Sequence, residues 1–177
     1  MDHSQQSALV NASYPKLIFA GLATIYFVWI AYDPLAGSFL DLVDLGIHET
    51  GHFVFAPFGE FMGFAGGSLF QIIMPAAFVG YFIWKHSYYS AAIVLFWVGQ
   101  SILNVFVYAQ DAVTMLLPLV GGGIHDWNWM LERLGWLSYT KSIAGMIRLI
   151  GTFTIFIAAI LSIYFAFNSP VDEYEEI

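Results

Sequence analysis

Residues 45–55 read LGIHETGHFVF, a HExxH pentapeptide inside a strongly apolar run. On a helix, His48 and His52 lie one turn apart on the same face, so two imidazole nitrogens can bind one divalent metal. Glu49 stands beside them, where its carboxylate can take a proton from an activated water. The stretch therefore predicts a zinc site with His48 and His52 as ligands and Glu49 as catalytic base. The alternative is a helix whose histidines only form hydrogen bonds, or bind a pigment or haem instead of zinc.

Two acidic residues precede this motif on the same helical stripe. Asp41, Asp44, His48 and His52 follow one another at spacings of three, four and four. Asp44 could accept the ring N–H that His48 does not need for the metal, and so fix its tautomer. Alternatively, both aspartates lie near a helix N-terminus at the membrane surface, where the helix dipole favours anions.

The composition is that of a membrane protein. Of the 177 residues, 59% are hydrophobic and only 10% are charged, which excludes an ordinary soluble globule. The long apolar runs exceed any barrel strand, so the membrane spans are expected to be helices. The net charge of −8 and the scattered basic residues argue against nucleic-acid binding. The chain has no cysteine, so any zinc must be held by histidine and carboxylate.

The pattern predicts an all-α fold, a polytopic membrane bundle of about five transmembrane helices with a short interfacial helix. The bundle forms one domain, 15–169, between a polar N-terminal tail, 1–14, and an acidic C-terminal tail, 170–177. Pro57 and Gly59 are expected to break the chain after the motif helix. Asp126 is expected to cap the short helix, which ends at Gly135. The expected spans are 16–32, 37–55, 61–84, 90–109 and 142–167.

A second polar stripe supplies candidates for the third metal ligand, which HExxH must take from elsewhere. Gln100, Asn104, Tyr108 and Asp111 are spaced four, four and three apart, so they share one helix face that must point into the protein. Asp111 is the first candidate, although it could equally cap a short helix. His125 is the second, because it follows the flexible glycines 121–123.

Small residues follow the break, with Gly63, Gly66, Gly67 and Ser68 near the start of the third span. They favour close packing of a neighbouring helix, and they would also let an extended substrate lie against the backbone.

The basic residues give a prediction of topology. If each run crosses once, Lys16, Arg133 and Lys141 fall on one side of the membrane and Lys85 on the other. Positive charges favour the cytoplasmic side. We therefore expect a protein of a bacterial inner membrane with a cytoplasmic N-terminus and its acidic tail outside.

The motif His48-Glu49-Thr50-Gly51-His52, the Gly66-Gly67 segment and a later polar helix with Asn104 and Asp111 together resemble the site-2-protease class of intramembrane zinc metallopeptidases. The resemblance covers roughly residues 40–130. It implies that the two histidines and a later aspartate, here Asp111, bind Zn²⁺, and that Glu49 activates water for peptide hydrolysis. It also implies that Asn104 donates a hydrogen bond to the substrate backbone or to an oxyanion.

Two functions follow as hypotheses. The first is an intramembrane peptidase that works in the lipid bilayer on a transmembrane protein substrate. The second is a non-catalytic subunit of a larger membrane complex, for example photosynthetic or respiratory, which retains the peptidase-like fold and a structural metal. An aromatic content of 19% suits packing against partner helices, lipids or pigments.

Overall fold

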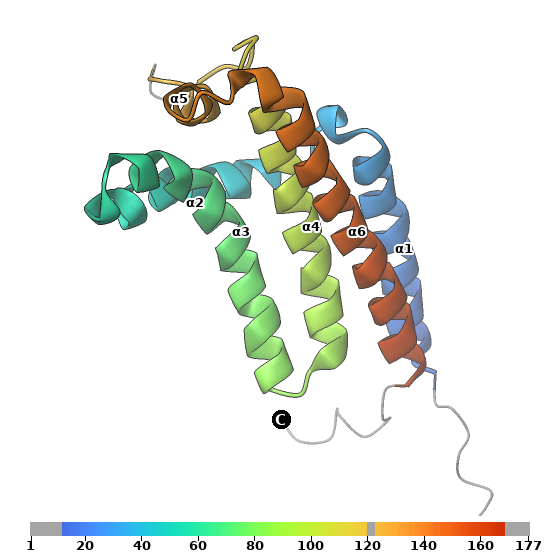
Figure 1. Ribbon diagram of the computed structural model, residues 1–177. Coiled ribbons are helices and arrows are strands. Elements are labelled where there is room, and N and C mark those ends of the chain that lie inside the picture. The colour runs from blue at the N-terminus through green and yellow to red at the C-terminus, as the bar shows by residue number, and fades with distance from the viewer. Residues whose placement is uncertain (1–11, 120–122, 169–177) are drawn as a thin grey trace, which may run out of the picture.

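The computed structural model describes residues 12–119 and 123–168, and its regular elements there are all helical. Figure 1 shows α1, α3, α4 and α6 side by side, with α2 lying across them and α5 at the top of the view. Short 3₁₀ turns lie between several of these helices. The helices are α1 (Tyr14–Tyr32), α2 (Asp41–Phe55), α3 (Glu60–Trp84), α4 (Tyr88–Gln110), α5 (Asp126–Arg133) and α6 (Thr140–Phe167).

Four segments of the described chain are long and apolar enough to cross a membrane: α1, α3, α4 and the stretch Leu137–Phe167 that contains α6. This is one fewer than the sequence predicts, because the motif helix α2 is not among them. Its 15 residues span about 22 Å at 1.5 Å per residue, short of the roughly 30 Å hydrocarbon core. The chain is therefore compatible with an integral membrane protein that has four spans and a transverse motif helix.

The corner between α2 and α3 forms where the sequence predicts it. Pro57 lies in a 3₁₀ turn, Ala56–Phe58, and Gly59 follows with φ 105°, a conformation that side chains other than glycine's rarely adopt. The returning α3 then packs along α2. Their backbones touch at Gly51 and Gly66, since a Cβ on Gly66 would lie 2.6 Å from the Gly51 carbonyl oxygen. Close helix packing is thus the role of this glycine pair.

The helix α4 forms the centre of the bundle and packs against α1, α3 and α6. It meets α6 at Gly99, where a Cβ would lie 2.6 Å from the Ile155 side chain. Phe96, Leu103 and Ile155 are among the largest fully buried side chains of the core between these helices. Packed against α6 in this way, α4 presents a row of polar side chains to α2.

The helix order corrects the predicted topology. Ser13 N donates to Ala166 O at 3.1 Å, so α1 begins beside the end of α6. Tyr89 Oη donates to Lys16 O at 2.8 Å, which places the start of α4 at this same end. Lys16 and Lys85 therefore share one end of the bundle, and the segment of Arg133 and Lys141 lies at the other (Figure 1). The expected separation of Lys16 from Lys85 is therefore wrong, because both lie at the same end of the bundle. The acidic tail, 170–177, lies outside the described residues.

Candidate metal centre

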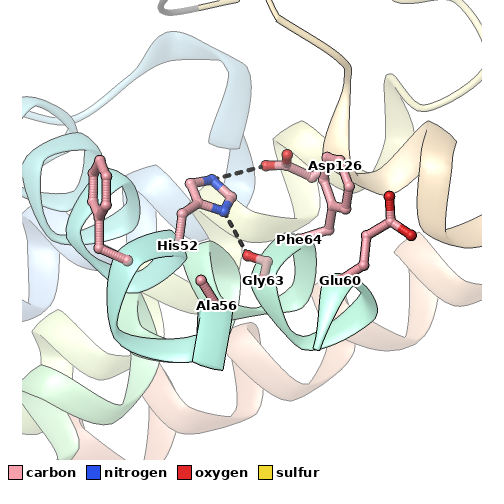
Figure 2. Close-up of a pocket in the computed structure, with 7 residues that line it drawn as sticks. His52, Ala56, Glu60, Gly63, Phe64 and Asp126 are labelled. Carbon is pink, nitrogen blue, oxygen red and sulfur yellow. Dashed lines mark hydrogen bonds and ion pairs between the residues drawn. The ribbon is translucent and has the colours of Figure 1, made fainter. Parts of the chain in front are cut away.

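A cavity of about 380 Å³ lies at the corner of α2 and α3. Figure 2 shows His52 beside it, between Asp126 of α5 and the backbone of α3. The other lining residues are mainly apolar, with Glu60 as a further acid. The lining residues are His52, Phe53, Ala56, Glu60, Gly63, Phe64 and Asp126. A cavity of this size can receive a small molecule or a few residues of an extended chain.

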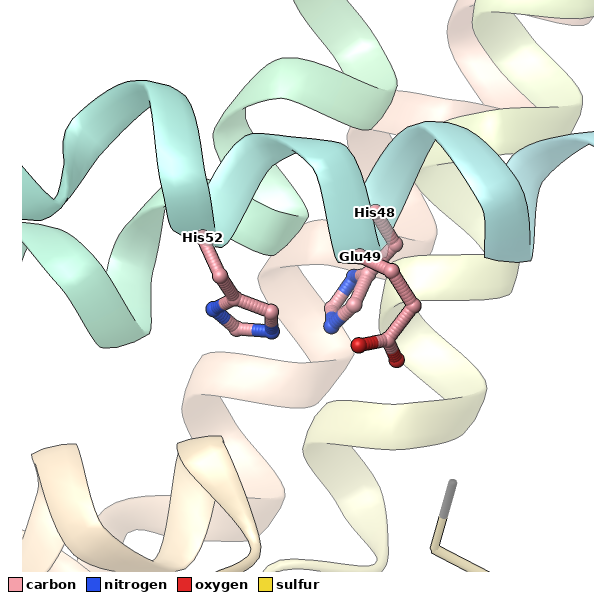
Figure 3. Close-up of side chains that lie close together, drawn as sticks. All are labelled: His48, Glu49 and His52. Carbon is pink, nitrogen blue, oxygen red and sulfur yellow. The ribbon is translucent and has the colours of Figure 1, made fainter. Parts of the chain in front are cut away.

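The HExxH motif gathers its three side chains as the helix period predicts. His48, Glu49 and His52 each offer a ligand atom, and these atoms lie within 4.8 Å of one another. Figure 3 shows all three side chains on the same side of α2. The two rings are 4.8 Å apart between centroids and nearly perpendicular. His48 is buried, whereas His52 and Glu49 are half-buried, so the group can be reached from the cavity at its His52 side.

The tautomer of His52 is fixed by the backbone of α3. Its Nδ1 lies 2.7 Å from the Gly63 carbonyl oxygen, which can only accept, so Nδ1 carries the hydrogen. His52 Nε2 is therefore the nitrogen that remains for a metal ion or a second proton.

The tautomer of His48 is fixed by a chain of amides that ends on a carboxylate. Asp41 Oδ1 accepts from Asn104 Nδ2 at 3.1 Å, so the oxygen of Asn104 faces away from Asp41 and accepts from Gln71 Nε2 at 2.7 Å. Gln71 must then present its oxygen to His48 Nδ1, at 3.2 Å. His48 Nδ1 thus carries a hydrogen and Nε2 is the free nitrogen. We call this chain, His48–Gln71–Asn104–Asp41, the amide relay.

The third group at the centre is Asp126, the first residue of α5. Its Oδ2 lies 3.1 Å from His48 Nε2 and 3.4 Å from His52 Nε2. Figure 2 shows the contact with His52. Two ring lone pairs and a carboxylate oxygen repel one another unless a positive charge lies among them. Ligand atoms bound tetrahedrally to zinc at 2.0–2.2 Å are about 3.3 Å apart, which matches both separations. The donor set therefore fits zinc.

The same arrangement explains two pKa shifts. The hydrogen bond to Asp126 is the main cause that raises the pKa of His52 to about 9, so without a metal a proton occupies Nε2. Burial would raise the pKa of Asp126, but its close contacts with His48 and His52 outweigh burial and hold the pKa at about 2. Asp126 is thus an anion at neutral pH, ready to pair with a cation.

The two residues that the sequence offers as third ligand lie together elsewhere. Asp111 follows α4, and its carboxylate accepts from Leu116 N at 3.0 Å and Leu117 N at 2.9 Å. His125 Nε2 lies 3.6 Å from Asp111 Oδ2, and its Nδ1 accepts from Asn128 N as the N-cap of α5. Burial lowers the pKa of His125, so the ring is neutral. These two residues hold the segment that presents Asp126.

The remaining predicted site residues form hydrogen bonds between α2 and α4. The sequence suggested that Asp44 accepts the ring N–H of His48, but in the structure Gln71 accepts it. Asp44 instead accepts from Trp97 and Ser101 of α4. Asn104 uses both of its amide atoms in the amide relay, and Gln100 Nε2 donates to Asp41 at 2.8 Å.

Sequence reasoning missed Gln71 and Asp126 as site residues. Gln71 lies on α3 and Asp126 far along the chain, so neither shares a helical period with the motif. Asp126 also resembles an ordinary N-cap, and only its place beside His125, itself a candidate, marked the segment.

Comparison of the chain with protein-family models, with curated proteins and with solved structures finds no match. The metal centre is therefore interpreted from its own geometry.

Gly67 of α3 gives the first testable consequence. A Cβ on Gly67 would lie 2.5 Å from His48 Nε2 and 2.6 Å from Cε1, so Gly67→Ala must displace the ring. We expect a loss of about 1–3 kcal/mol in stability, as for other overpacked sites, together with weaker zinc binding. Thermal unfolding and zinc titration of the purified protein measure both effects.

Gly80→Ala is the matched control, because Gly80 is on the same helix and a Cβ there meets nothing within 4 Å. That variant should be as stable as the original chain or slightly more so. Equal zinc binding by both variants would contradict the placement of His48.

Proposed function

We propose that the protein is a zinc-dependent intramembrane peptidase. The observation that carries the proposal is the convergence of His48 Nε2 and His52 Nε2 on Asp126 Oδ2, next to Glu49 and beside a cavity. Zinc held by these three residues would act as a Lewis acid and lower the pKa of a coordinated water toward 7.

Glu49 is the residue that can handle protons in this site. It neighbours both histidines but forms neither of the hydrogen bonds that fix their tautomers. It can therefore take a proton from the attacking water and return it to the leaving amine. The amide relay and the Gly63 carbonyl hold the two imidazoles in place while Glu49 does so.

The cavity gives the proposal a place for the substrate. Phe53, Ala56 and Phe64 supply apolar walls, and His52 and Asp126 lie on the polar side. A transmembrane segment would have to unwind to enter, because only an extended backbone exposes its carbonyl to attack. We infer that the substrate is a membrane protein with a transmembrane helix that unwinds easily near the cleavage site.

The metal content of the purified protein tests this function. We expect about one zinc per chain after purification without chelator, and hydrolysis of an unwound transmembrane peptide that stops when zinc is removed and returns when it is restored. A protein that neither contains nor takes up zinc would contradict the proposal.

A non-catalytic subunit of a larger membrane complex is the second candidate. It is favoured by the large aromatic and aliphatic side chains exposed on α1 and α6, among them Trp29 and Phe153, which can pack on partner helices as well as on lipid. In that case Glu49→Gln would leave metal content and assembly unchanged, and no peptide would be cleaved.

Location in a bacterial inner membrane and a cytoplasmic N-terminus remain predictions. The structure changes the grouping of charges on which the orientation was based, because Lys16 and Lys85 lie toward one end of the bundle and the other three basic residues, Arg133, Lys141 and Arg148, lie toward the other. Reporter proteins fused at either terminus would establish the orientation, and both should report the same side.

A further inference from the structure

A second polar cluster lies under the first turns of α2, away from the metal centre. Asp44 is fully buried, and its Oδ1 accepts from Trp97 Nε1 at 2.9 Å and from Ser101 Oγ at 3.1 Å. Asp44 Oδ2 is buried without any hydrogen-bond partner, and so is Gln100 Oε1, whose residue is 1% exposed. Such unpaired buried oxygens are rare and need an explanation.

No change in side-chain orientation satisfies both oxygens. Gln100 Nε2 already donates to Asp41 Oδ1 at 2.8 Å, and the Gln100 side chain also acts on Asp44. Turning the amide over would only move the conflict, because its oxygen would then face the carboxylate of Asp41. The two oxygens therefore lack a hydrogen-bond donor or a cation between them.

No Lys or Arg side chain supplies such a charge. All Lys and Arg residues of the chain lie in the described part, and none of them forms an ion pair with Asp41 or Asp44 there. The groups of α4 that face Asp44, namely Trp97, Gln100 and Ser101, are neutral. An ionised carboxylate that is fully buried, as Asp44 is, with a second acid one turn away on the same helix, is unfavourable unless it is neutralised.

We propose that Asp44 Oδ2 and Gln100 Oε1 together bind one monovalent cation, either a proton carried by the carboxyl group or Na⁺. A proton on Oδ2 would donate to Gln100 Oε1 and so satisfy both unpaired atoms at once. A sodium ion would use the same two oxygens as ligands. This inference does not depend on the peptidase function, since among the described residues no hydrogen bond joins Asp44 or Gln100 to His48, His52 or Asp126.

The surroundings of Asp44 support a bound positive charge. Burial is the largest influence and raises the pKa of Asp44, and the side chains of Trp97, Ser101 and Gln100, which lower it, offset burial only in part. Asp41 on the same helix raises it further, and His48 is the next titratable group along α2. On α3, the side chain of Gln71 is neutral and donates a long hydrogen bond, 3.5 Å, to Ser101 O.

Binding at this site would fix α2 on α4. Loss of the cation would leave two carboxylates facing each other beneath the motif helix, so the folded state would be destabilised. The folded pKa of Asp44 lies above its unfolded value. The stability that the proton contributes is therefore present at low pH and lost as pH rises through the folded value.

Thermal unfolding of the full chain in nanodiscs tests the site, measured over a pH series in NaCl and in KCl of equal ionic strength. If the site holds a proton, the unfolding temperature falls by several degrees as pH rises, equally in both salts. The infrared spectrum then contains a protonated carboxyl band that shifts in heavy water. If the site holds sodium, NaCl raises the unfolding temperature by several degrees over KCl.

Asp44→Asn removes the site while keeping a donor for Gln100 Oε1, so this variant should fold. It should lose the infrared band in the first case and the sodium effect in the second. Glu132→Gln, an exposed acid of α5, is the control and should change neither. The proposal is overturned if the wild-type protein shows neither a protonated carboxyl band nor a higher unfolding temperature in NaCl than in KCl. The same holds if either signal persists in Asp44→Asn.

Discussion

Asp126→Asn is expected to lower zinc affinity by more than about a hundredfold. Changes to residues that only orient a ligand typically cost 10–100-fold, and here the change removes the single anion among the three converging atoms. The amide of Asn has a similar shape, so the fold of α5 should be retained. Zinc per chain after purification, and a competition titration with a chelator of known affinity, measure the effect.

Two further variants make this experiment decisive. Glu132→Gln alters an exposed acid on the same helix and should bind zinc as the original chain does. Asp111→Asn tests the ligand that the sequence suggested, and it should retain zinc, because Asp111 is occupied by the backbone of residues 116 and 117. If Asp111→Asn loses zinc and Asp126→Asn keeps it, the assignment of the third ligand is wrong.

Glu49→Gln is expected to abolish most peptide hydrolysis while leaving zinc in place. Positioned general acids and bases contribute about a hundredfold to ten-thousandfold to rate, and Gln cannot accept the proton. Zinc should stay bound, because the proposed ligand set consists of His48, His52 and Asp126 and does not include Glu49. Cleavage of a transmembrane peptide and zinc content should be measured on the same preparation.

Glu132→Gln again serves as the control and should cleave at the original rate. A Glu49→Gln protein that cleaves as fast as the original chain would exclude Glu49 as the base. Zinc-loaded protein that cleaves nothing in either form would favour the structural role in a membrane complex.

Local patterns in the sequence identified the motif side of the site. The spacing of His48, Glu49 and His52 requires only one helix, and the structure gathers their ligand atoms within 4.8 Å. The same reasoning selected Asp44 as the partner of His48, because Asp44 is one turn away on the same helix. The actual partner, Gln71, is on α3, and helical periodicity says nothing about residues on a neighbouring helix.

The number of spans was overestimated for a similar reason. Hydropathy treats residues 37–55 as one apolar run, but the helix itself begins only at Asp41 and ends at Phe55. Gly37 and Gly59, both with positive φ, bound this segment as turns. Asp44, in the first turn of α2, is then buried against α4, and Asp41 beside it is half-buried. Tertiary contacts with Trp97 and Ser101, which hydropathy cannot show, determine this placement.

The hydrogen bond between Ser13 and Ala166 has a practical consequence for experiments. It joins the start of α1 to the end of α6 at the end of the bundle remote from α2 and α5 (Figure 1). Protein immobilised on a sensor through either terminus would therefore present its HExxH helix outward. Kinetics of metal or peptide capture can be recorded on such a surface without the support obstructing access.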